Sequence, residues 1–285
     1  MRDALIENLY AAAQQSGESL YALIDLASVP NGLRVLKLQQ SPDSACLFEG
    51  SIQANAAAVA PWLLRIGNAD SERRRLRDCV DAALTYPALS WIVTPLSLDE
   101  LLTRLRRRLD ARLPDSYDVL LRYYDPRVLP MLAAQLHEPQ QRAFFCICSQ
   151  WLYLDRDDKL QRIESVAARE ADILETILEL DANQQNALIA AAEIDVVLSD
   201  LGNVHMQPFM EMTRTQRYHF AARQLAHTRE LKLEQPHEAM TLCMLALTLG
   251  EDFVQQTGWQ AALDQVRERQ ITLDQAIEQM ETHHA

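Results

Sequence analysis

The pattern of apolar residues changes near residue 155, and this change constrains the fold more than any other feature of the chain. Before it, short runs of β-branched, aromatic and leucine side chains alternate with amphipathic segments, which predicts strands interleaved with helices. After it, the periodic segments repeat at helical spacing. The sequence therefore predicts an α+β protein, with an N-terminal mixed α/β lobe whose sheet is flanked by helices, followed by a C-terminal all-helical lobe.

The same change indicates where the domains begin and end. We expect an N-terminal helix over residues 1–17, an α/β domain over 18–155, a charged connecting segment over 156–180 and an acidic helical domain over 181–285. A chain of 285 residues is longer than most single domains, which agrees with this division. Within the helical domain, MTLCMLALTLG at 240–250 is apolar on nearly all sides and predicts a central buried helix.

Acidic side chains are concentrated in the second half of the chain. Residues 1–160 hold 20 acidic and 18 basic residues, a net charge of −2, whereas residues 161–285 hold 20 acidic and 9 basic residues, a net charge of −11. The second half would therefore repel nucleic acid and anionic lipid. We expect neither nucleic acid nor a membrane as a partner.

The ends and the cysteines of the chain point to a compartment. The N-terminal residues lack a continuous apolar core, and no run approaches the roughly 20 apolar residues that cross a bilayer. The five cysteines form no CxxC pair, and an odd number of them without a leader indicates reduced thiols. These features predict a cytoplasmic protein.

Glycine is scarce, and this excludes several kinds of active site. The chain has seven glycines, of which the closest pair, Gly250 and Gly258, is eight residues apart. Dinucleotide fingerprints, phosphate-binding loops and nucleophile elbows all need glycines that are closer together. There is no HExxH zinc motif, and the Asp155-containing segment lacks the later glycine and glutamate of a calcium loop. We expect no cofactor, no metal and no catalytic residue, and we predict that the chain is not an enzyme.

The segment 117–136 (YDVLLRYYDPRVLPMLAAQL) carries the strongest local signals. Its first part, Tyr117–Tyr124, is typical of a buried strand. Asp125 can then accept a backbone N–H at a helix N-cap, with Pro126 at the first helical position, where proline is well tolerated. Four-residue spacing gives this helix one apolar face, formed by Val128, Leu132 and Leu136.

Three charged residues, Arg122, Asp125 and Arg127, surround this strand–helix junction. They could be catalytic or could bind an anion. However, a capping aspartate would occupy the helix amides that an anion needs, and Pro126 removes one donor. A structural network of ion pairs is favoured, with Asp25 as the partner of Arg122, because breaking a buried pair costs several kcal/mol.

Ser97–Leu113 is the clearest helix, because Ser97 and Glu100 can form a capping box and leucines recur along one face. Five arginines on this helix, and four more between residues 73 and 77, could contact nucleic acid, phosphate or an acidic protein surface. A solvated face opposite the leucines is the favoured interpretation, since the chain as a whole is acidic.

The segment 142–148 predicts a further strand, with Cys146 and Cys148 on one of its faces. Two cysteines on one face could form half of a metal site or a redox pair. Free cysteine is more often a small buried side chain, and we favour that interpretation.

Four segments together resemble a known family. They lie in its order and spacing: YALIDLA at 21–27, PWLL at 61–64, SWIVTPLSLDELLTRLRRRL at 90–109 and LLRYYDPRVLPML at 120–132. The chain resembles the adaptor or chaperone family of bacterial type VI secretion (the Tap or Tec type), and RYYDPR is the most specific motif. The resemblance covers residues 20–155 and is weaker over 181–270, and the segment after Arg142 matches the family pattern only loosely.

The resemblance implies protein binding. Members are cytoplasmic accessory proteins that bind a toxic effector and help to load it onto the spike protein of the secretion needle. A secreted effector and the spike protein are therefore the expected partners, and the acidic helical domain is expected to contact a basic or amphipathic part of the effector. The residues that carry the family signature, as structural or partner-binding residues, are Tyr21, Asp25, Trp62, Trp91, Arg122, Tyr124, Asp125, Pro126 and Arg127.

Two other classes of function stay open at this point. A nucleic-acid- or anion-binding accessory protein would use the two arginine groups and would bind with a steep salt dependence. A hydrolase would have a deep pocket in which a nucleophile and a base converge.

Overall fold

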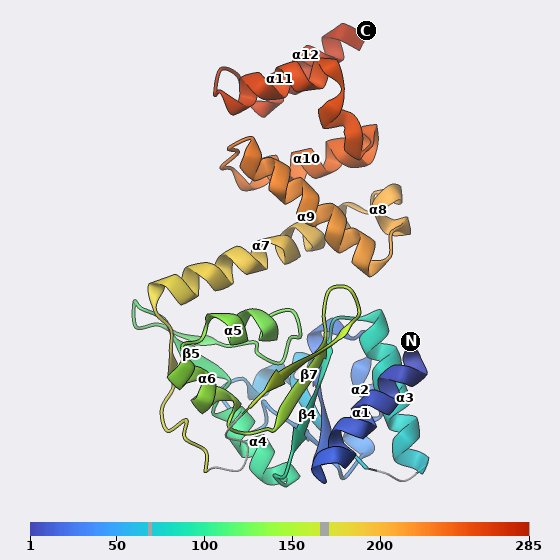
Figure 1. Cartoon of the computed structure of the whole chain (residues 1–285), viewed down its shortest axis with the longest axis vertical. Helices are drawn as coiled ribbons and strands as arrows, with labels where there is room; N and C mark the ends of the chain where they lie inside the picture. Colours follow the sequence, from blue (N-terminus) through green and yellow to red (C-terminus); the bar gives the residue numbers. More distant parts are fainter. Residues whose placement is uncertain (68–69, 166–170, 285) are drawn as a thin grey trace. The chain divides into compact units, whose positions relative to one another are not determined.

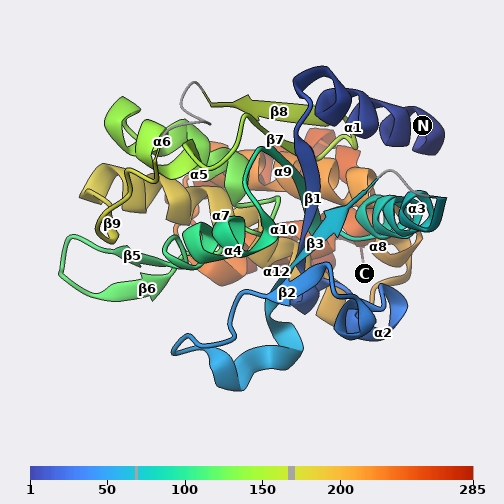
Figure 2. The same cartoon turned by 90° about the horizontal axis from the view of Figure 1, so that it is seen from below.

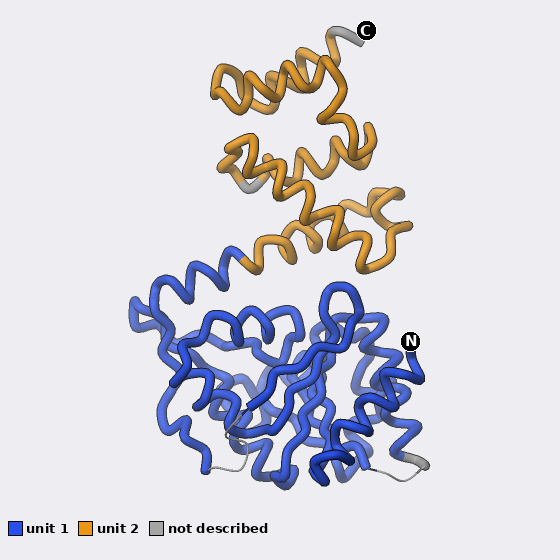
Figure 3. The backbone as a smooth tube through the Cα atoms, viewed as in Figure 1, with its two compact units in different colours: residues 1–190 blue, residues 191–285 orange. Residues whose placement is uncertain are grey.

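The chain divides into two units, residues 1–190 and residues 191–285, and each contains a hydrophobic core (Figure 3). The computed structural model describes residues 1–67, 70–165 and 171–284. The fold class is α+β, as the sequence predicted, because an antiparallel sheet with helices is followed by a helical C-terminal region.

A six-stranded antiparallel sheet forms the centre of the first unit (Figure 1). Its order is β2-β3-β1-β4-β7-β8, so β1 lies between β3 and β4. From Leu20 to Asp25 every residue of β1 is buried, as expected for a strand that is covered on both faces. The strands are β1 (Ser19–Asp25), β2 (Ser44–Cys46), β3 (Pro61–Ile66), β4 (Leu89–Thr94), β7 (Gln150–Leu154) and β8 (Leu160–Glu164).

Successive side chains of β1 enter two different cores, because side chains alternate between the faces of a strand. Tyr21 and Leu23 pack with the helices α4, α5 and α6, whereas Leu20, Ala22 and Ile24 pack with α1 and α3. Figure 2 shows these two groups of helices on opposite sides of the sheet. The helices are α1 (Arg2–Ser16), α2 (Gly32–Val35), α3 (Asp70–Thr85), α4 (Leu98–Arg106), α5 (Leu129–Gln135) and α6 (Glu138–Phe145).

A second, smaller sheet lies in the same unit. Its strands are β5 (Asp110–Arg112), β6 (Asp118–Leu120) and β9 (Leu178–Glu179), with β5 in the middle, antiparallel to β6 and parallel to β9. Strands β8 and β9 are formed by residues of the expected connecting segment, of which 166–170 lie outside the described residues.

The second unit consists of helices around an aromatic and leucine core that includes Phe220, Leu242 and Phe253. Helix α10 was expected to be buried on all sides, but Met244 and Leu249 are 39% and 45% exposed, so one face of α10 reaches the surface. The helices are α7 (Ala182–Val204), which begins in the first unit, α8 (Gln207–Glu211), α9 (Arg214–Glu230), α10 (Pro236–Leu249), α11 (Thr257–Arg267) and α12 (Leu273–His284).

Three predicted elements differ from the structure. The strand expected over Tyr117–Tyr124 is wrong beyond Leu120, because Tyr123 and Tyr124 are buried by ring contacts within turns and not by strand pairing. The helix expected to reach Leu113 ends at Arg106, and β5 follows it.

The strand expected over residues 142–148 is also wrong. Most of this segment belongs to α6, whose N-terminus has a capping box formed by His137 and Gln140. Cys146 and Cys148 follow the helix and are buried free thiols, which confirms the favoured interpretation of the two cysteines.

A bilayer-spanning helix is not found in the described ranges, 1–67, 70–165 and 171–284, since none of their helices is both sufficiently long and sufficiently apolar.

Candidate functional site

The charged residues of the RYYDPR motif form a network with the end of strand β1. Arg122 Nη2 donates to Asp25 Oδ2 at 2.7 Å and lies 3.4 Å from Asp125 Oδ2. Arg127 binds Asp125 in bidentate fashion, with Nε–Oδ1 and Nη2–Oδ2 distances of 2.9 and 2.8 Å. The predicted pairing of Asp25 with Arg122 is therefore confirmed, across 97 residues of sequence.

Asp25 is the most buried member of this network. Its side chain is fully buried at the C-terminal end of β1, whereas the Arg122 side chain is 43% exposed. Burial raises the pKa of the Asp25 carboxyl above its ordinary value, and Arg122 offsets only part of this effect. Asp25 also accepts hydrogen bonds from the Ala27 backbone N–H and the Ser28 hydroxyl, at 3.1 and 3.2 Å. The carboxylate thus joins the network to the loop that follows β1.

Asp125 is buried too, and it stabilises a turn at the predicted position. Its Oδ1 accepts the backbone N–H of Arg127 at 2.9 Å, and its carbonyl oxygen accepts those of Val128 and Leu129. Regular helix α5 begins only at Leu129, so the prediction that Asp125 and Pro126 are the N-cap and first residue of this helix is wrong by three residues. Pro130, not Pro126, lies in the first turn of the helix, and Pro126 is buried in the preceding turn.

The ring of Tyr124 lies against the ion-pair network and also contacts an apolar side chain. Its ring packs edge-on against Phe48 at a centroid distance of 6.3 Å, and the Arg122 guanidinium carbon lies 6.0 Å from the ring centroid. Burial raises the pKa of Tyr124 to about 12. The neighbouring Tyr123 points into the core and donates a hydrogen bond from its hydroxyl to the Leu105 carbonyl at 2.7 Å.

The remaining signature residues lie in the sheet, apart from the ion pairs. Tyr21 is fully buried, and its hydroxyl donates to the Leu96 carbonyl at 2.9 Å. Trp91 is fully buried on the opposite face of the sheet, and Trp62 is partly buried between the two cores. The structure therefore divides the nine residues into a core group and an ion-pair group.

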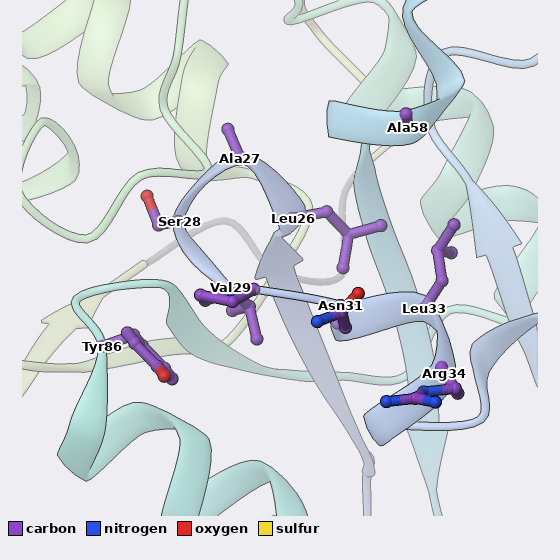
Figure 4. Close-up of a pocket in the computed structure, with 11 residues that line it drawn as sticks. Leu26, Ala27, Ser28, Val29, Asn31, Leu33, Arg34, Ala58 and Tyr86 are labelled. Carbon is purple, nitrogen blue, oxygen red and sulfur yellow. The ribbon is translucent and has the colours of Figure 1, made fainter.

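A hollow of about 470 Å³ lies beside the network (Figure 4). The loop after β1 forms most of it, with Ala58 and Tyr86 contributed by other segments. The lining residues are Leu26, Ala27, Ser28, Val29, Pro30, Asn31, Gly32, Leu33, Arg34, Ala58 and Tyr86. They include one hydroxyl beside Asp25 and one guanidinium, and histidine, cysteine and carboxylate side chains are not among them.

A second buried ion pair was not predicted. Arg108 is fully buried, and Nη2 and Nη1 donate to Asp172 Oδ1 and Oδ2 at 2.7 and 3.2 Å. It also donates to the backbone carbonyls of Phe144, Ala143 and Arg104 and to the sulfur of Cys146. This guanidinium therefore connects the end of α4, the end of α6 and the segment that leads to β9.

A signal for this pair was present in the sequence. Leu101, Leu105 and Arg108 are separated by four and three residues, so Arg108 belongs to the apolar face of the helix rather than to the opposite one. The assignment of all these arginines to a solvated face was therefore wrong at this position. Arg106 differs from that expectation too, since it donates to the backbone carbonyls of Leu47 and Cys46 at 3.0 and 2.8 Å.

Three further arginines contact other side chains at the surface. Arg112 forms a two-point contact with Asp118 across the β5–β6 pair, at 2.8 and 3.1 Å. Arg73 lies 5.3 Å from the ring centroid of Tyr10, and Arg75 lies 3.9 Å from Asp43. Among the described residues, groups of three or more His, Cys, Asp or Glu side chains that could hold a metal ion are not found.

The ion-pair network is better suited to holding the backbone in one conformation than to transferring protons. Both of its aspartates are ion-paired with arginines, and Asp25 and Asp125 each accept further hydrogen bonds from backbone N–H groups. Such networks perturb pKa values for structural reasons as well as catalytic ones. Its position at the end of β1 makes it a support for the loop that lines the hollow.

Comparison with known proteins supplies one match. Residues 20–143 match a family described as a domain of unknown function, DUF4123. The matched part begins in β1 and ends in α6, so it contains the nine signature residues, both aspartates of the network and the whole lining of the hollow. No curated protein and no solved structure matches the chain.

Proposed function

We propose that the chain is an adaptor, not an enzyme, which binds a toxic effector of bacterial type VI secretion and helps to load it onto the spike protein. The observation that carries the proposal is the match of residues 20–143 to DUF4123, a domain that is in general associated with type VI secretion effector adaptors. The four sequence segments that resemble this adaptor family lie inside the matched region.

The architecture is consistent with a protein that works through its surfaces. The charged side chains of the RYYDPR motif form ion pairs within the protein. The neighbouring loops and helices are therefore the segments that we expect to contact partners. The second unit carries 14 acidic and 7 basic residues, a net charge of −7, and so favours a basic or amphipathic part of a partner. Such a partner could be recognised without any covalent chemistry.

Co-expression of the full chain with two candidate partners tests the proposal. The partners to be tried are a toxin and a spike protein chosen from the products of the genes that flank the gene of this chain. We expect the chain to co-elute with the toxin in size-exclusion chromatography and the spike protein to join this complex. The toxin should keep its mass in mass spectrometry. If the chain binds neither protein, the adaptor function is contradicted. A change in the covalent mass of the toxin would indicate that the chain is an enzyme.

A further inference from the structure

We infer that the hollow beside Asp25 is the part of the adaptor that receives its protein partner, and that it binds a segment in which an aliphatic side chain lies between carboxylates. This inference rests on the proposed function, since the effector supplies the segment. It goes further because it names the surface, the chemistry of the ligand and the residues that select it.

The floor of the hollow is apolar and fixed. Leu26 and Val29 are buried beneath it, and Leu33 is half-buried in its wall. Gly32 allows the loop to close, because a Cβ at this position would lie 2.6 Å from Leu26 Cδ2 and 3.1 Å from Val29 Cβ. Asp25 fixes the start of the same loop through Ala27 and Ser28. A preformed apolar floor loses little entropy when it binds a side chain.

Exposed aliphatic side chains are next in sequence to residues that line the hollow, which favours a protein segment over a small molecule. Val35 and Val59 are 53% and 47% exposed, and each follows a residue that lines the hollow, Arg34 and Ala58. Ile52, in the same stretch of chain between β2 and β3, is 88% exposed. Aliphatic side chains that are exposed around a hollow are typical of protein-binding surfaces.

The charges around the hollow favour an acidic segment. Figure 4 shows Ser28 and Arg34 on opposite sides of it. Ser28 shares the Oδ2 atom of Asp25 with Arg122, so a half-exposed guanidinium lies next to that side. Arg34 is exposed and lines the hollow, the Arg122 side chain is 43% exposed, and carboxylate side chains are not among the lining residues. Carboxylates on either side of an inserted aliphatic side chain complement this arrangement.

Two substitutions in the full chain test the surface, each with a matched control. Arg34→Glu reverses the charge at the hollow, and Arg74→Glu makes the same change on the exposed surface of α3. Ala58→Trp fills the hollow, and Ala54→Trp places the same ring at an exposed position of the same short helical segment, which does not line it. The probe is the purified toxin encoded beside the chain's gene, and its dissociation constant is measured by calorimetry after circular dichroism has confirmed that each variant is folded.

We expect Arg34→Glu and Ala58→Trp each to weaken binding by about tenfold or more, and both controls to stay within about twofold of the unsubstituted chain. A scan of Asp and Glu to Lys in the toxin should identify one substitution that restores binding to the Arg34→Glu variant. If the unsubstituted chain binds and both hollow variants bind equally well, the hollow proposal is overturned while the adaptor function stands. If the unsubstituted chain binds neither toxin nor spike protein, both proposals fail.

Discussion

Asp25 shows how a single buried charge can connect distant parts of the chain. It ends the central strand, pairs with Arg122 and anchors the loop that lines the hollow. A buried carboxylate is tolerated only while it keeps a charged partner, because desolvation is costly. The stability of this region should therefore depend on the pair as a unit more than on either residue.

A double-mutant cycle tests this dependence. Arg122→Met should lower the free energy of unfolding by about 3 kcal/mol, because Asp25 would remain buried and charged without its partner. Adding Asp25→Asn should recover most of this loss, since the amide carries no charge. Urea denaturation measures all three variants. If the losses of the two single variants simply add in the double variant, the two side chains do not depend on each other.

Asp172 should make stability depend on pH. Hydrogen bonds and charge from Arg108 outweigh the effect of burial and hold the pKa of Asp172 below its ordinary value of 3.8. The folded state therefore binds this proton less tightly than the unfolded state does, so the pair stabilises the fold fully above the ordinary pKa. That stabilisation is lost as pH falls through the lowered pKa. Asp25, whose pKa is raised, acts in the opposite sense, because its charged form is the one that folding disfavours.

Comparison of the unsubstituted chain with Asp172→Asn measures this effect. The difference in free energy of unfolding should be constant above about pH 5 and should shrink as the solution becomes more acidic than the ordinary pKa of aspartate. Chemical denaturation at a series of pH values follows it. A difference that stays the same down to the lowest accessible pH would mean that the charge of Asp172 contributes nothing.

At the scale of elements, two capping boxes fix the start of α7. Gln184, which is 2% exposed, accepts the Asp181 backbone N–H at 3.0 Å, and its own amide donates to the Gln135 carbonyl and to Gln140 Oε1 at 2.9 and 2.7 Å. Gln140 in turn belongs to the capping box of α6 with His137. The N-terminus of α7 is thereby bonded to the corner between α5 and α6.

Gln184→Ala should loosen this attachment. We expect a loss of about 1 kcal/mol in the free energy of unfolding, because half-buried groups of Gln135 and Gln140 and the backbone N–H of Asp181 lose a hydrogen-bond partner. Faster hydrogen exchange of the amides at the start of α7 should accompany the loss. Asn186→Ala, at an exposed position of the same helix, is the control and should change neither quantity. Unchanged exchange in the Gln184 variant would show that the caps alone do not fix the helix.

The elements that the sequence predicted well are those with strong local signals. The capping box of Ser97 and Glu100 begins α4 as predicted. Asp181 caps α7 and Thr213 caps α9, since a capping side chain bonds backbone two or three residues away and depends little on tertiary context.

The failures arose where tertiary contacts decide the conformation. The aromatic and leucine residues after Leu120 have strand propensity, but the rings of Phe144 and Trp151 bury Tyr123 without any strand partner. Likewise, the partner of Arg108 lies 64 residues away, and only the folded chain brings Asp172 to it. The pairing of Asp25 with Arg122 was predicted because a charge inside an apolar strand needs an opposite charge. The hollow was not predicted, because its wall combines a loop with Ala58 and Tyr86.

At the scale of the whole molecule, the two units have separate cores. The first is built around the sheet and the second around Leu242 and its neighbours. Contacts within a core stabilise mainly the unit that contains it. The chain should therefore unfold in two steps rather than one.

Calorimetry of two core variants of the full chain tests this. Leu242→Ala should destabilise the second unit by about 3 kcal/mol and lower only one thermal transition, because it opens a cavity in that core alone. Leu23→Ala, at an equally buried position of β1, should lower the other transition. A single transition that both variants shift alike would show that the units unfold together.

The parallel pairing of β5 with β9 has a consequence for synthesis on the ribosome. Ala111 lies opposite Leu178, and Arg108 pairs with Asp172, so the first unit needs residues that are translated long after its central strands. Until they emerge, a nascent chain carries a guanidinium without its carboxylate and a short sheet without its last strand. The first unit can therefore finish folding only when translation has reached the start of α7. A polypeptide released before residue 172 should be recognised by chaperones or proteases as incompletely folded.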